Sequence, residues 1–241
     1  MFNKIPRFKY LTPSKMYPSQ WEFILSKAKS VVTSLSGLKE SLEKRDRLVM
    51  YLRGNELIGL TSFNFLPWNF NNSQVIILFQ GNTWLSPTWR GRNINQILAT
   101  LTLLELYIKY PLQKKYFFAA CSNYKSYLFL TKNTSNFWPN PGQETPDNFQ
   151  QLIHQLSDVF YPGEYNPKTK LIESPGERGF QDNDVNTDDG EKRNRYIQFY
   201  LEKNPDYRNG KKLPCLVNIS FLEFSAIGKN VLLRFLKNLK P

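Results

Sequence analysis

The stretch best suited to chemistry spans residues 85–98, LSPTWRGRNINQIL, where the pattern of a strand gives way to that of a helix. The first backbone N–H groups of a helix have no partner within the helix, and the helix dipole adds partial positive charge at that end. Arg90 and Arg92 immediately precede the expected helix start. These groups together predict a site for an anion such as a pyrophosphate. The alternative is an ordinary strand-to-helix turn with two solvated arginines.

Three further residues of this stretch could shape the backbone around such an anion. Gly91 has no side chain and allows a ligand to approach the backbone closely. Asn93 and Asn95 could each adopt the left-handed conformation or cap the helix that follows.

Other reactive side chains give weaker signals. His154, the only histidine, lies in the helical pattern QQLIHQL and is expected on a surface helix rather than as a catalytic base. Cys121 stands among apolar neighbours, which favours a buried inert thiol over a nucleophile. Cys121 and Cys215 could form one disulfide, but two free buried thiols are the favoured prediction. The sequence contains no Ser/His/Asp triad, zinc-ligand spacing or Walker pattern, so we expect no metal.

The composition excludes several classes of protein. The chain has 241 residues, 41% hydrophobic and 15% aromatic, which excludes a wholly disordered or fibrous protein. No apolar run approaches the roughly 20 residues that a membrane span requires. The start, MFNKIPRFKY, has positive charge but no apolar core, so we expect no signal peptide and a cytoplasmic location.

The charge is unevenly distributed. The chain carries 32 Lys and Arg against 20 Asp and Glu, a net charge of +12. Residues 57–143 hold seven basic residues and one acid, whereas residues 144–193 hold five basic residues and eleven acids. The basic body predicts an anionic partner, which could be nucleic acid, a phosphorylated cofactor, an acidic carrier protein or a membrane surface. Residues 161–193 are predicted to form an acidic, mobile insert centred on 173–193.

The first half of the chain predicts helices followed by an antiparallel meander. Residues 18–45 have helical spacing, and Gly37 is expected to divide them into two helices. Two strand patterns, 47–53 and 56–68, flank a Gly-Asn pair that predicts a hairpin turn. A third strand pattern follows at 74–87.

The second half alternates helices and strands. Apolar residues recur at helical spacing from Ile94, and Pro111 closes that helix. Further segments are assigned by the same reasoning: a strand at 115–122, helices at 126–133 and 147–160, strands at 195–205 and 213–224, and an amphipathic helix at 225–241. The whole chain is therefore predicted to be one mixed α/β domain, 1–241.

The order of these elements over residues 18–138 resembles that of the GNAT superfamily of acyl-coenzyme A-dependent N-acyltransferases. In that family a long strand leads into a pyrophosphate loop of pattern Q/R-x-x-G-x-G/A at a helix start. Here the corresponding residues are RGRNIN: Arg90 matches the first position, and Asn93 and Asn95 replace the two small residues. The resemblance implies a twisted, mostly antiparallel central sheet flanked by helices. The charge pattern places the acidic insert before the last two predicted strands.

The resemblance also implies a donor site. In the family, the strand before the loop splays from the next strand, and the pantetheine arm of coenzyme A lies in the gap. Carried over to this sequence, backbone groups near the end of that strand contact the pantetheine or thioester, and the loop binds the phosphates. The implied coenzyme-binding residues are Trp84, Leu85, Arg90, Gly91, Arg92, Asn93, Ile94 and Asn95.

The catalytic groups that the resemblance implies match less closely. The family tends to place an Asn after the next strand and a Tyr about seven residues later, which protonates the leaving thiolate. Asn123 fits the first position, and Tyr127 lies one turn before the second. A core aromatic is the alternative role for Tyr127. The strand at 74–86 offers no carboxylate base, although Gln80 and Asn82 could hold a water.

These observations predict an N-acyltransferase that moves an acyl group from a thioester donor to a primary amine by direct attack in a ternary complex. The donor is acyl-CoA, of short or long chain, or an acyl carrier protein, and the acceptor is a small molecule or a peptide side chain. The aromatic residues at 63–70 could line a pocket for a long acyl chain or belong to the core. A catalytically inactive GNAT-like binding protein is the alternative. A nucleic-acid-binding protein is less favoured because the basic residues are scattered, and the oligomeric state stays open.

Overall fold

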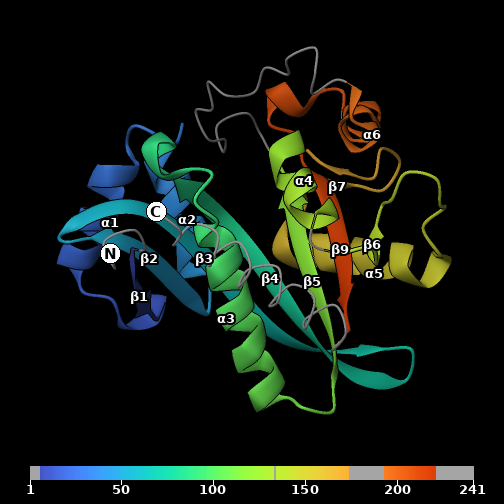
Figure 1. Cartoon of the computed structure of the whole chain (residues 1–241), viewed down its shortest axis with the longest axis horizontal. Helices are drawn as coiled ribbons and strands as arrows, with labels where there is room; N and C mark the ends of the chain where they lie inside the picture. Colours follow the sequence, from blue (N-terminus) through green and yellow to red (C-terminus); the bar gives the residue numbers. More distant parts are fainter. Residues whose placement is uncertain (1–5, 133, 174–192, 221–241) are drawn as a thin grey trace, which may run out of the picture.

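The computed structural model describes residues 6–132, 134–173 and 193–220. Its centre is a twisted seven-stranded sheet in the order β1-β2-β3-β4-β5-β9-β6 (Figure 1). Neighbouring strands are antiparallel except β4 and β5, which are parallel. The strands are β1 (Arg7–Leu11), β2 (Arg47–Arg53), β3 (Glu56–Phe70), β4 (Ser73–Leu85), β5 (Lys114–Cys121), β6 (Phe137–Trp138) and β9 (Leu213–Ile219). This architecture confirms the fold class predicted from the sequence.

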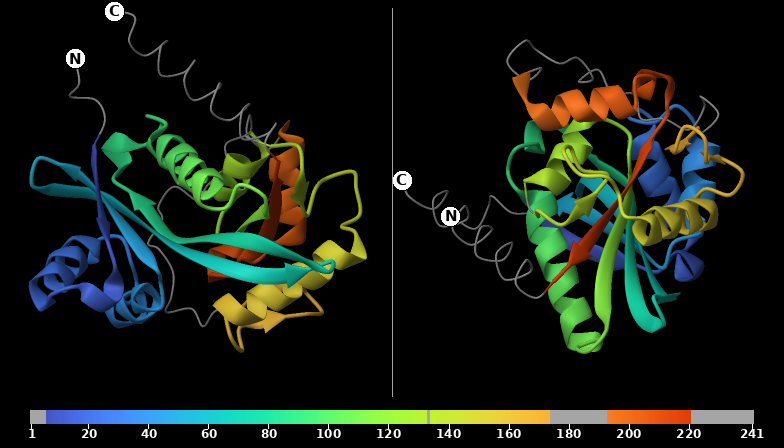
Figure 2. Two further views of the ribbon diagram at one scale, coloured as in Figure 1. Left: turned by 90° about the horizontal axis from the view of Figure 1, so that it is seen from below. Right: turned by 90° about the vertical axis from the view of Figure 1, so that its right-hand side faces the viewer.

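Helices cover both faces of the sheet. One apolar cluster joins α3, α4 and α6 to one face, while α1 and α2 pack on the other face over β2 and β3, and α5 packs there over β4, β5 and β9. Figure 2 shows α3 and α4 on the opposite side of the sheet from α1, α2 and α5. The helices are α1 (Pro18–Ala28), α2 (Leu35–Glu43), α3 (Ile94–Lys109), α4 (Tyr124–Thr131), α5 (Asp147–Phe160) and α6 (Arg195–Lys203).

The N-terminal pair of helices is present, but the predicted break at Gly37 is wrong. The break lies between Ala28 and Leu35, and Gly37 lies in the first turn of α2. The Gly37 N–H donates to the side chain of Ser34 at 3.1 Å. Because a serine cap satisfies one of the unpaired N–H groups at a helix start, it fixes where α2 begins and tolerates a glycine just inside it.

The hairpin of β2 and β3, the strand β4, and the succession α3, β5, α4, α5 confirm the predicted order of elements in the middle of the chain. Asn71 and Asn72 make the β3–β4 turn with φ of 49° and 57°, which is the left-handed region that asparagine tolerates. Cys121 and Cys215 are buried free thiols, as predicted. Within the described parts of the chain, no helix has the length and apolar content that crossing a membrane requires.

The prediction of a strand at 195–205 is wrong, because these residues form α6. Asn194 caps this helix by accepting the Tyr196 N–H at 2.9 Å, and its buried residues Ile197 and Tyr200 lie three apart. Among the described residues, the insert therefore precedes α6 and β9 rather than two strands. The predicted C-terminal helix at 225–241 lies outside the described residues.

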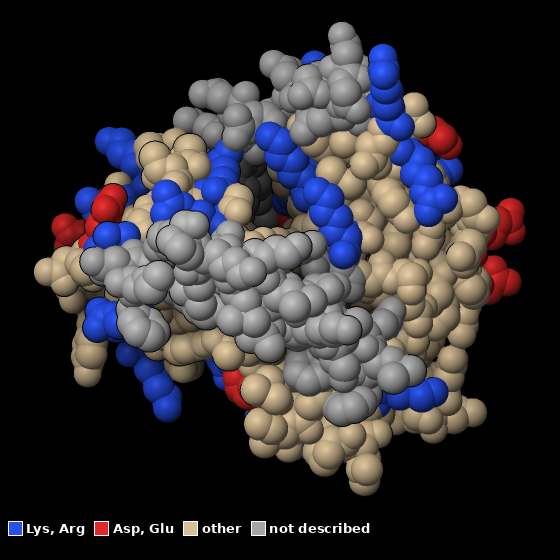
Figure 3. Space-filling view, in the orientation of Figure 1, with Lys and Arg blue, Asp and Glu red and all other residues tan. Residues whose placement is uncertain are grey.

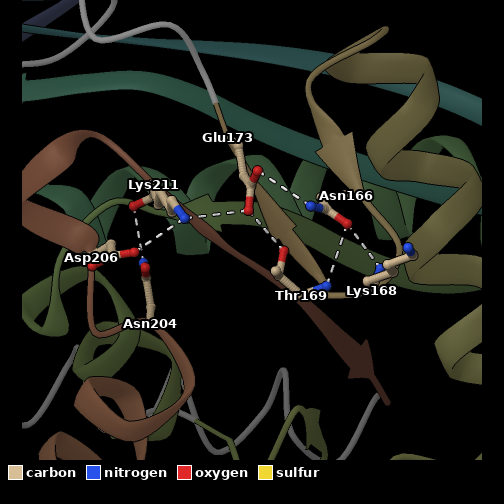
Figure 4. A network of polar contacts seen from close by, with 7 residues as sticks. All are labelled: Asn166, Lys168, Thr169, Glu173, Asn204, Asp206 and Lys211. Atoms are coloured by element: carbon tan, nitrogen blue, oxygen red, sulfur yellow. Dashed lines mark hydrogen bonds and ion pairs between the residues drawn. The ribbon is translucent and has the colours of Figure 1, made fainter.

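The structure describes residues 161–173 of the acidic insert, and residues 174–192 lie outside the described residues. The short strands β7 (Tyr165–Asn166) and β8 (Leu171–Ile172) pair with each other. Figure 4 shows how Glu173, directly after β8, accepts hydrogen bonds from Asn166 and Thr169. Lys211 forms ion pairs with Glu173 at 3.4 Å and with Asp206 at 3.1 Å. This polar network fastens the hairpin to the segment that leads into β9.

Candidate functional site

The sheet opens between its two parallel strands. Residues 75–79 of β4 pair with residues 114–118 of β5, and the pairing ends there. β4 continues to Leu85 without β5, while β5 remains paired with β9 as far as Cys121. Figure 1 shows the two strands diverging, and Figure 3 shows a hollow in this region with Lys and Arg side chains beside it. The splayed strands implied by the resemblance are therefore present.

A bulge in β4 accompanies this divergence. Leu60 of β3 faces Trp84, whereas Ser62 faces Gly81, so β4 contains one residue more than β3 over this interval. Asn82, inside the bulge, has φ of 49°. Its side-chain oxygen accepts the Ser62 hydroxyl at 3.0 Å. The bulge thus bends β4 and is held by hydrogen bonds to β3.

Beyond the bulge, β4 lies very close to β3. A Cβ on Gly59 would be 2.7 Å from the Trp84 carbonyl oxygen, so the close approach requires a glycine. The Trp84 side chain is buried against α1 and α2. The Leu85 carbonyl accepts the Arg90 Nε–H at 3.1 Å. Of the two positions expected to contact pantetheine, Leu85 therefore has its carbonyl engaged by the loop itself.

The loop before α3 has the backbone shape expected of an anion site. Gly91 and Asn93 have φ of 76° and 59°, so both adopt the left-handed conformation. Asn93 does not cap the helix with its side chain. α3 begins at Ile94, which is buried in the core. The left-handed turn therefore leads directly into the first turn of α3, where backbone N–H groups are available to an anion.

The structure shows where Asn95 points. Its side-chain oxygen accepts the Tyr51 hydroxyl at 3.0 Å, and burial raises the pKa of Tyr51, which therefore remains a donor. The Asn95 side chain is held against β2 by this bond. The asparagine at this position therefore has a hydrogen-bond partner in the sheet.

Three arginines lie around the loop. Trp89 has the guanidinium of Arg92 at 4.6 Å and that of Arg53 at 5.3 Å from its ring centroid. Arg90 bonds to Leu85, as described above. Arg53, the last residue of β2, was not among the residues predicted from the sequence, because only the contact with Trp89 brings it to the loop. The three charges raise the electrostatic potential where α3 begins.

The two residues predicted to act in catalysis have clear structural partners. The Asn123 side chain accepts the Ser126 N–H at 2.9 Å and caps α4. Tyr127 is fully buried among aromatic side chains, and its hydroxyl donates to the Pro139 carbonyl at 2.8 Å. Burial raises the pKa of Tyr127. The structure therefore places the Tyr127 hydroxyl in a core hydrogen bond.

Other candidates occupy structural positions. Phe63 is buried in the main cluster, and Phe65, Trp68 and Phe70 pack against the core. His154 packs on Tyr165 with 5.1 Å between ring centroids, and burial lowers its pKa. Gln80 donates to Thr61 at 3.0 Å, beside the bulge. In the parts of the chain that are described, no three His, Cys, Asp or Glu residues gather as a metal site would require.

No family model matches the sequence, and no curated protein matches it. Several solved structures are similar. A probable N-acyltransferase from Enterococcus faecalis has 13% identity and a TM-score of 0.40, covering 54% of this chain but only 32% of that protein. An aminoglycoside acetyltransferase from a soil metagenome, in complex with sisomicin, has 14% identity and a TM-score of 0.39, covering 61% of this chain and 95% of that one. YhbS, a GNAT-family N-acetyltransferase from Escherichia coli in complex with CoA, has 12% identity and a TM-score of 0.37. The match covers 56% of this chain and 76% of that one.

The fold is GNAT-like. This description depends on the strand order, on the parallel pair that opens after residue 79 and on the left-handed loop at the start of α3.

Proposed function

We propose that this protein is an N-acyltransferase that transfers an acyl group from acyl-CoA to a primary amine. The observation that carries the proposal is the opening between β4 and β5, next to a left-handed, arginine-flanked loop at the start of α3. An extended thiol-bearing arm fits between two strands whose facing edges are unpaired, and a pyrophosphate fits the loop. The acyl group would then lie where the strands diverge.

The chemistry that this arrangement supports is direct attack on the thioester. Backbone N–H groups on the unpaired edge of β4, between residues 80 and 85, can donate to the thioester carbonyl and stabilise the charge that develops on its oxygen. Binding donor and amine together removes much of the entropic barrier of a bimolecular reaction. The amine loses its proton to water near Gln80 and Asn82, because neither amide can accept a proton itself.

The leaving group makes modest demands on the protein. A thiol has a pKa of about 8.5, so a thiolate departs without obligatory protonation. The core position of Tyr127 is compatible with a reaction that uses no tyrosine acid on α4. An acyl carrier protein is a second possible donor, since the net charge of +12 would attract its acidic surface.

Calorimetric titration with CoA and with acyl-CoA of increasing chain length tests the proposal. We expect micromolar binding of CoA that weakens in the Arg92→Ala variant and is unchanged in Arg208→Ala, in which the lost arginine stacks on Tyr207 away from the loop. Affinity that rises with chain length identifies a long-chain donor, whereas affinity independent of chain length identifies a short one. Absence of binding to CoA and to every acyl-CoA would refute the coenzyme site.

A catalytically inactive GNAT-like binding protein is the second candidate. It is favoured by the strand 73–85, which has no carboxylate base, and by the engaged hydroxyl of Tyr127. Release of free CoA thiol, followed with a thiol reagent over a panel of amines, separates the two functions. Amine-dependent release supports the enzyme, and tight CoA binding without release for any amine supports the binding protein.

A further inference from the structure

A second polar site lies at the point where β4 and β5 separate, on the face of the sheet opposite α3. Phe79 is the last residue of β4 that pairs with β5, and it packs against α5 on that face. The guanidinium of Arg45 lies 4.5 Å from the Phe79 ring centroid. The Tyr161 ring, directly after α5, lies 6.1 Å from the same ring. Residues distant in sequence thus meet beside the proposed position of the acyl group.

Arg45 has hydrogen-bonding capacity that the protein does not use. Its guanidinium donates to Asn64 at 3.2 Å and to Ser41 at 3.1 Å. Its Nε atom is buried and has no hydrogen-bond partner. No carboxylate of the described residues forms an ion pair with Arg45. The nearby Asp46 carboxylate accepts the backbone N–H of Phe65 at 2.7 Å. An unpaired buried donor on a charged group is costly and requires an explanation.

Tyr161 supplies a second unused donor. Its hydroxyl makes no hydrogen bond in the described part of the chain, although the residue is half-buried. Burial raises the pKa of Tyr161 to about 12, so the hydroxyl keeps its proton at neutral pH. Lys212, directly before β9, places its ammonium 5.1 Å from the Tyr161 ring centroid. Tyr161 also interacts electrostatically with Arg45 and with Glu164.

Hydrogen bonds connect this site to the bulge of β4. The Ser41 hydroxyl accepts from Arg45 and exchanges hydrogen bonds with the Asn82 side chain at 3.2 Å. Asn82 lies on the part of β4 that extends beyond β5. The unused donors and the coenzyme loop therefore lie on opposite faces of the sheet, beside the same opening.

We propose that Arg45 and Tyr161 form a subsite that binds a carboxylate of the amine acceptor. This inference rests on the proposed acyltransferase function, since it concerns the second substrate of the same reaction. A carboxylate oxygen can accept the Arg45 Nε–H, and the other oxygen can accept the Tyr161 O–H, which satisfies both donors. The acceptor is then an amino acid or another amine that carries a carboxylate.

A carboxylate suits the site better than a larger anion. A carboxylate has two oxygens in one plane, which can accept from two separate donors such as the Arg45 Nε–H and the Tyr161 O–H. The Phe79 ring covers one side of the Arg45 guanidinium at 4.5 Å, and Asn64 and Ser41 already accept from the two terminal nitrogens. The Nε–H is therefore the buried guanidinium donor left without a partner, and one oxygen of a small anion would satisfy it. The positive charge of Lys212 adds attraction for the anion without a direct contact to the acceptor.

The test compares acids with their amides. CoA-saturated protein is titrated with glycine, alanine and lysine, with the three corresponding amides, and with phosphoethanolamine. We expect at least one acid to bind more than tenfold tighter than its amide. In Tyr161→Phe and in Arg45→Gln, this preference should fall below threefold. Tyr165→Phe is the matched control, because that hydroxyl on β7 is also without a partner and lies outside the subsite.

Equal affinity for acid and amide in every pair would overturn the proposal, as would an undiminished preference in Tyr161→Phe, a variant that removes a single oxygen. Binding of phosphoethanolamine alone would also overturn it. Each variant is titrated with CoA separately. If the wild-type protein does not bind CoA, the acyltransferase proposal fails, and titration of the same pairs against the unliganded protein still decides whether the carboxylate subsite exists.

Discussion

The left-handed conformation of Asn93 allows a test that separates strain in the loop from binding to it. Asn93 has φ of 59° and ψ of 21° and makes no side-chain cap. An ordinary L-residue in this conformation costs about 1–2 kcal/mol, and asparagine costs less. We therefore expect Asn93→Ala to destabilise the protein by about 1 kcal/mol, which lowers Tm by roughly 2–4 °C for a domain of this size. Asn93→Gly should leave Tm almost unchanged, because glycine adopts this conformation without a steric penalty.

If the left-handed turn shapes the anion site, the Asn93 variant that loses more stability should also lose more affinity for CoA. We expect Asn93→Ala to weaken CoA binding several-fold in a calorimetric titration and Asn93→Gly to retain it. Asn72, in the β3–β4 turn, has a closely similar φ of 57° and provides the matched control. Asn72→Ala should lower Tm comparably with no effect on CoA. An unchanged Tm in both alanine variants would refute the strain argument, and equal CoA affinity in Asn93→Ala would refute the role of the turn in binding.

Three further predictions concern charges and the buried tyrosine. Removing both Arg90 and Arg92 by alanine substitution should weaken CoA binding more than tenfold, about 1.4 kcal/mol, and the same affinity in the double variant would exclude a phosphate role. Glu105→Gln breaks the ion pair of 2.6 Å between Glu105 on α3 and Arg47 on β2. Because the Glu105 side chain is 45% exposed, we expect the free energy of unfolding, measured by denaturant titration, to fall by only about 0.5 kcal/mol. Arg47 lowers the pKa of Glu105, so the ion pair stabilises the protein above pH 4.5, the ordinary pKa of a glutamate, and this stabilisation disappears as the pH falls through the lowered pKa. A difference in stability between Glu105→Gln and wild type that persists in strong acid would contradict this prediction. Tyr127→Phe should lower the free energy of unfolding by about 1–2 kcal/mol, because the Pro139 carbonyl loses its hydrogen-bond donor. We expect kcat to change less than twofold. A hundredfold fall in kcat would instead assign Tyr127 as the acid that protonates the leaving thiolate.

The parts of the fold that could be predicted are those in which local pattern and tertiary packing agree. The β2–β3 hairpin combines two apolar strands with a Gly-Asn turn, and α3 combines a helical stripe with a proline just beyond its end. The strand β1 (Arg7–Leu11) was not predicted. It lies at the edge of the sheet and is mostly exposed, so its sequence lacks the apolar pattern of a core strand.

The misassigned helix α6 shows where local pattern misleads. Its sequence, RYIQFYLEK, is rich in aromatic and β-branched residues, which favour strands in general. The buried pair Ile197 and Tyr200 has helical spacing, and Asn194 is a strong capping residue. Packing against α4 decides the outcome, because only a helix places both buried side chains toward the same neighbour.

The turn into α3, where we propose that CoA binds, could be located from the sequence, because its residues are contiguous and a helix start favours an anion. Arg45 and Tyr161 could not be predicted, since they are separated by more than a hundred residues and meet only through Phe79. The sequence does show that Tyr161 directly follows a helix and precedes Pro-Gly, which marks a turn but no chemistry.

The opening in the sheet relates these two sites to each other. A continuous sheet would separate a ligand at the α3 loop from one beside Phe79, because its backbone hydrogen bonds leave no passage between strands. Here β4 leaves β5 after residue 79, and the bulge at Asn82 bends it further. Asn82 is hydrogen-bonded to Ser41, and Ser41 accepts a hydrogen bond from Arg45. A change in the bulge would therefore alter the edge of β4 that faces the thioester and also the position of the Arg45 guanidinium. Substitution of Asn82 should therefore weaken donor and acceptor binding together, whereas Tyr161→Phe should affect the acceptor alone.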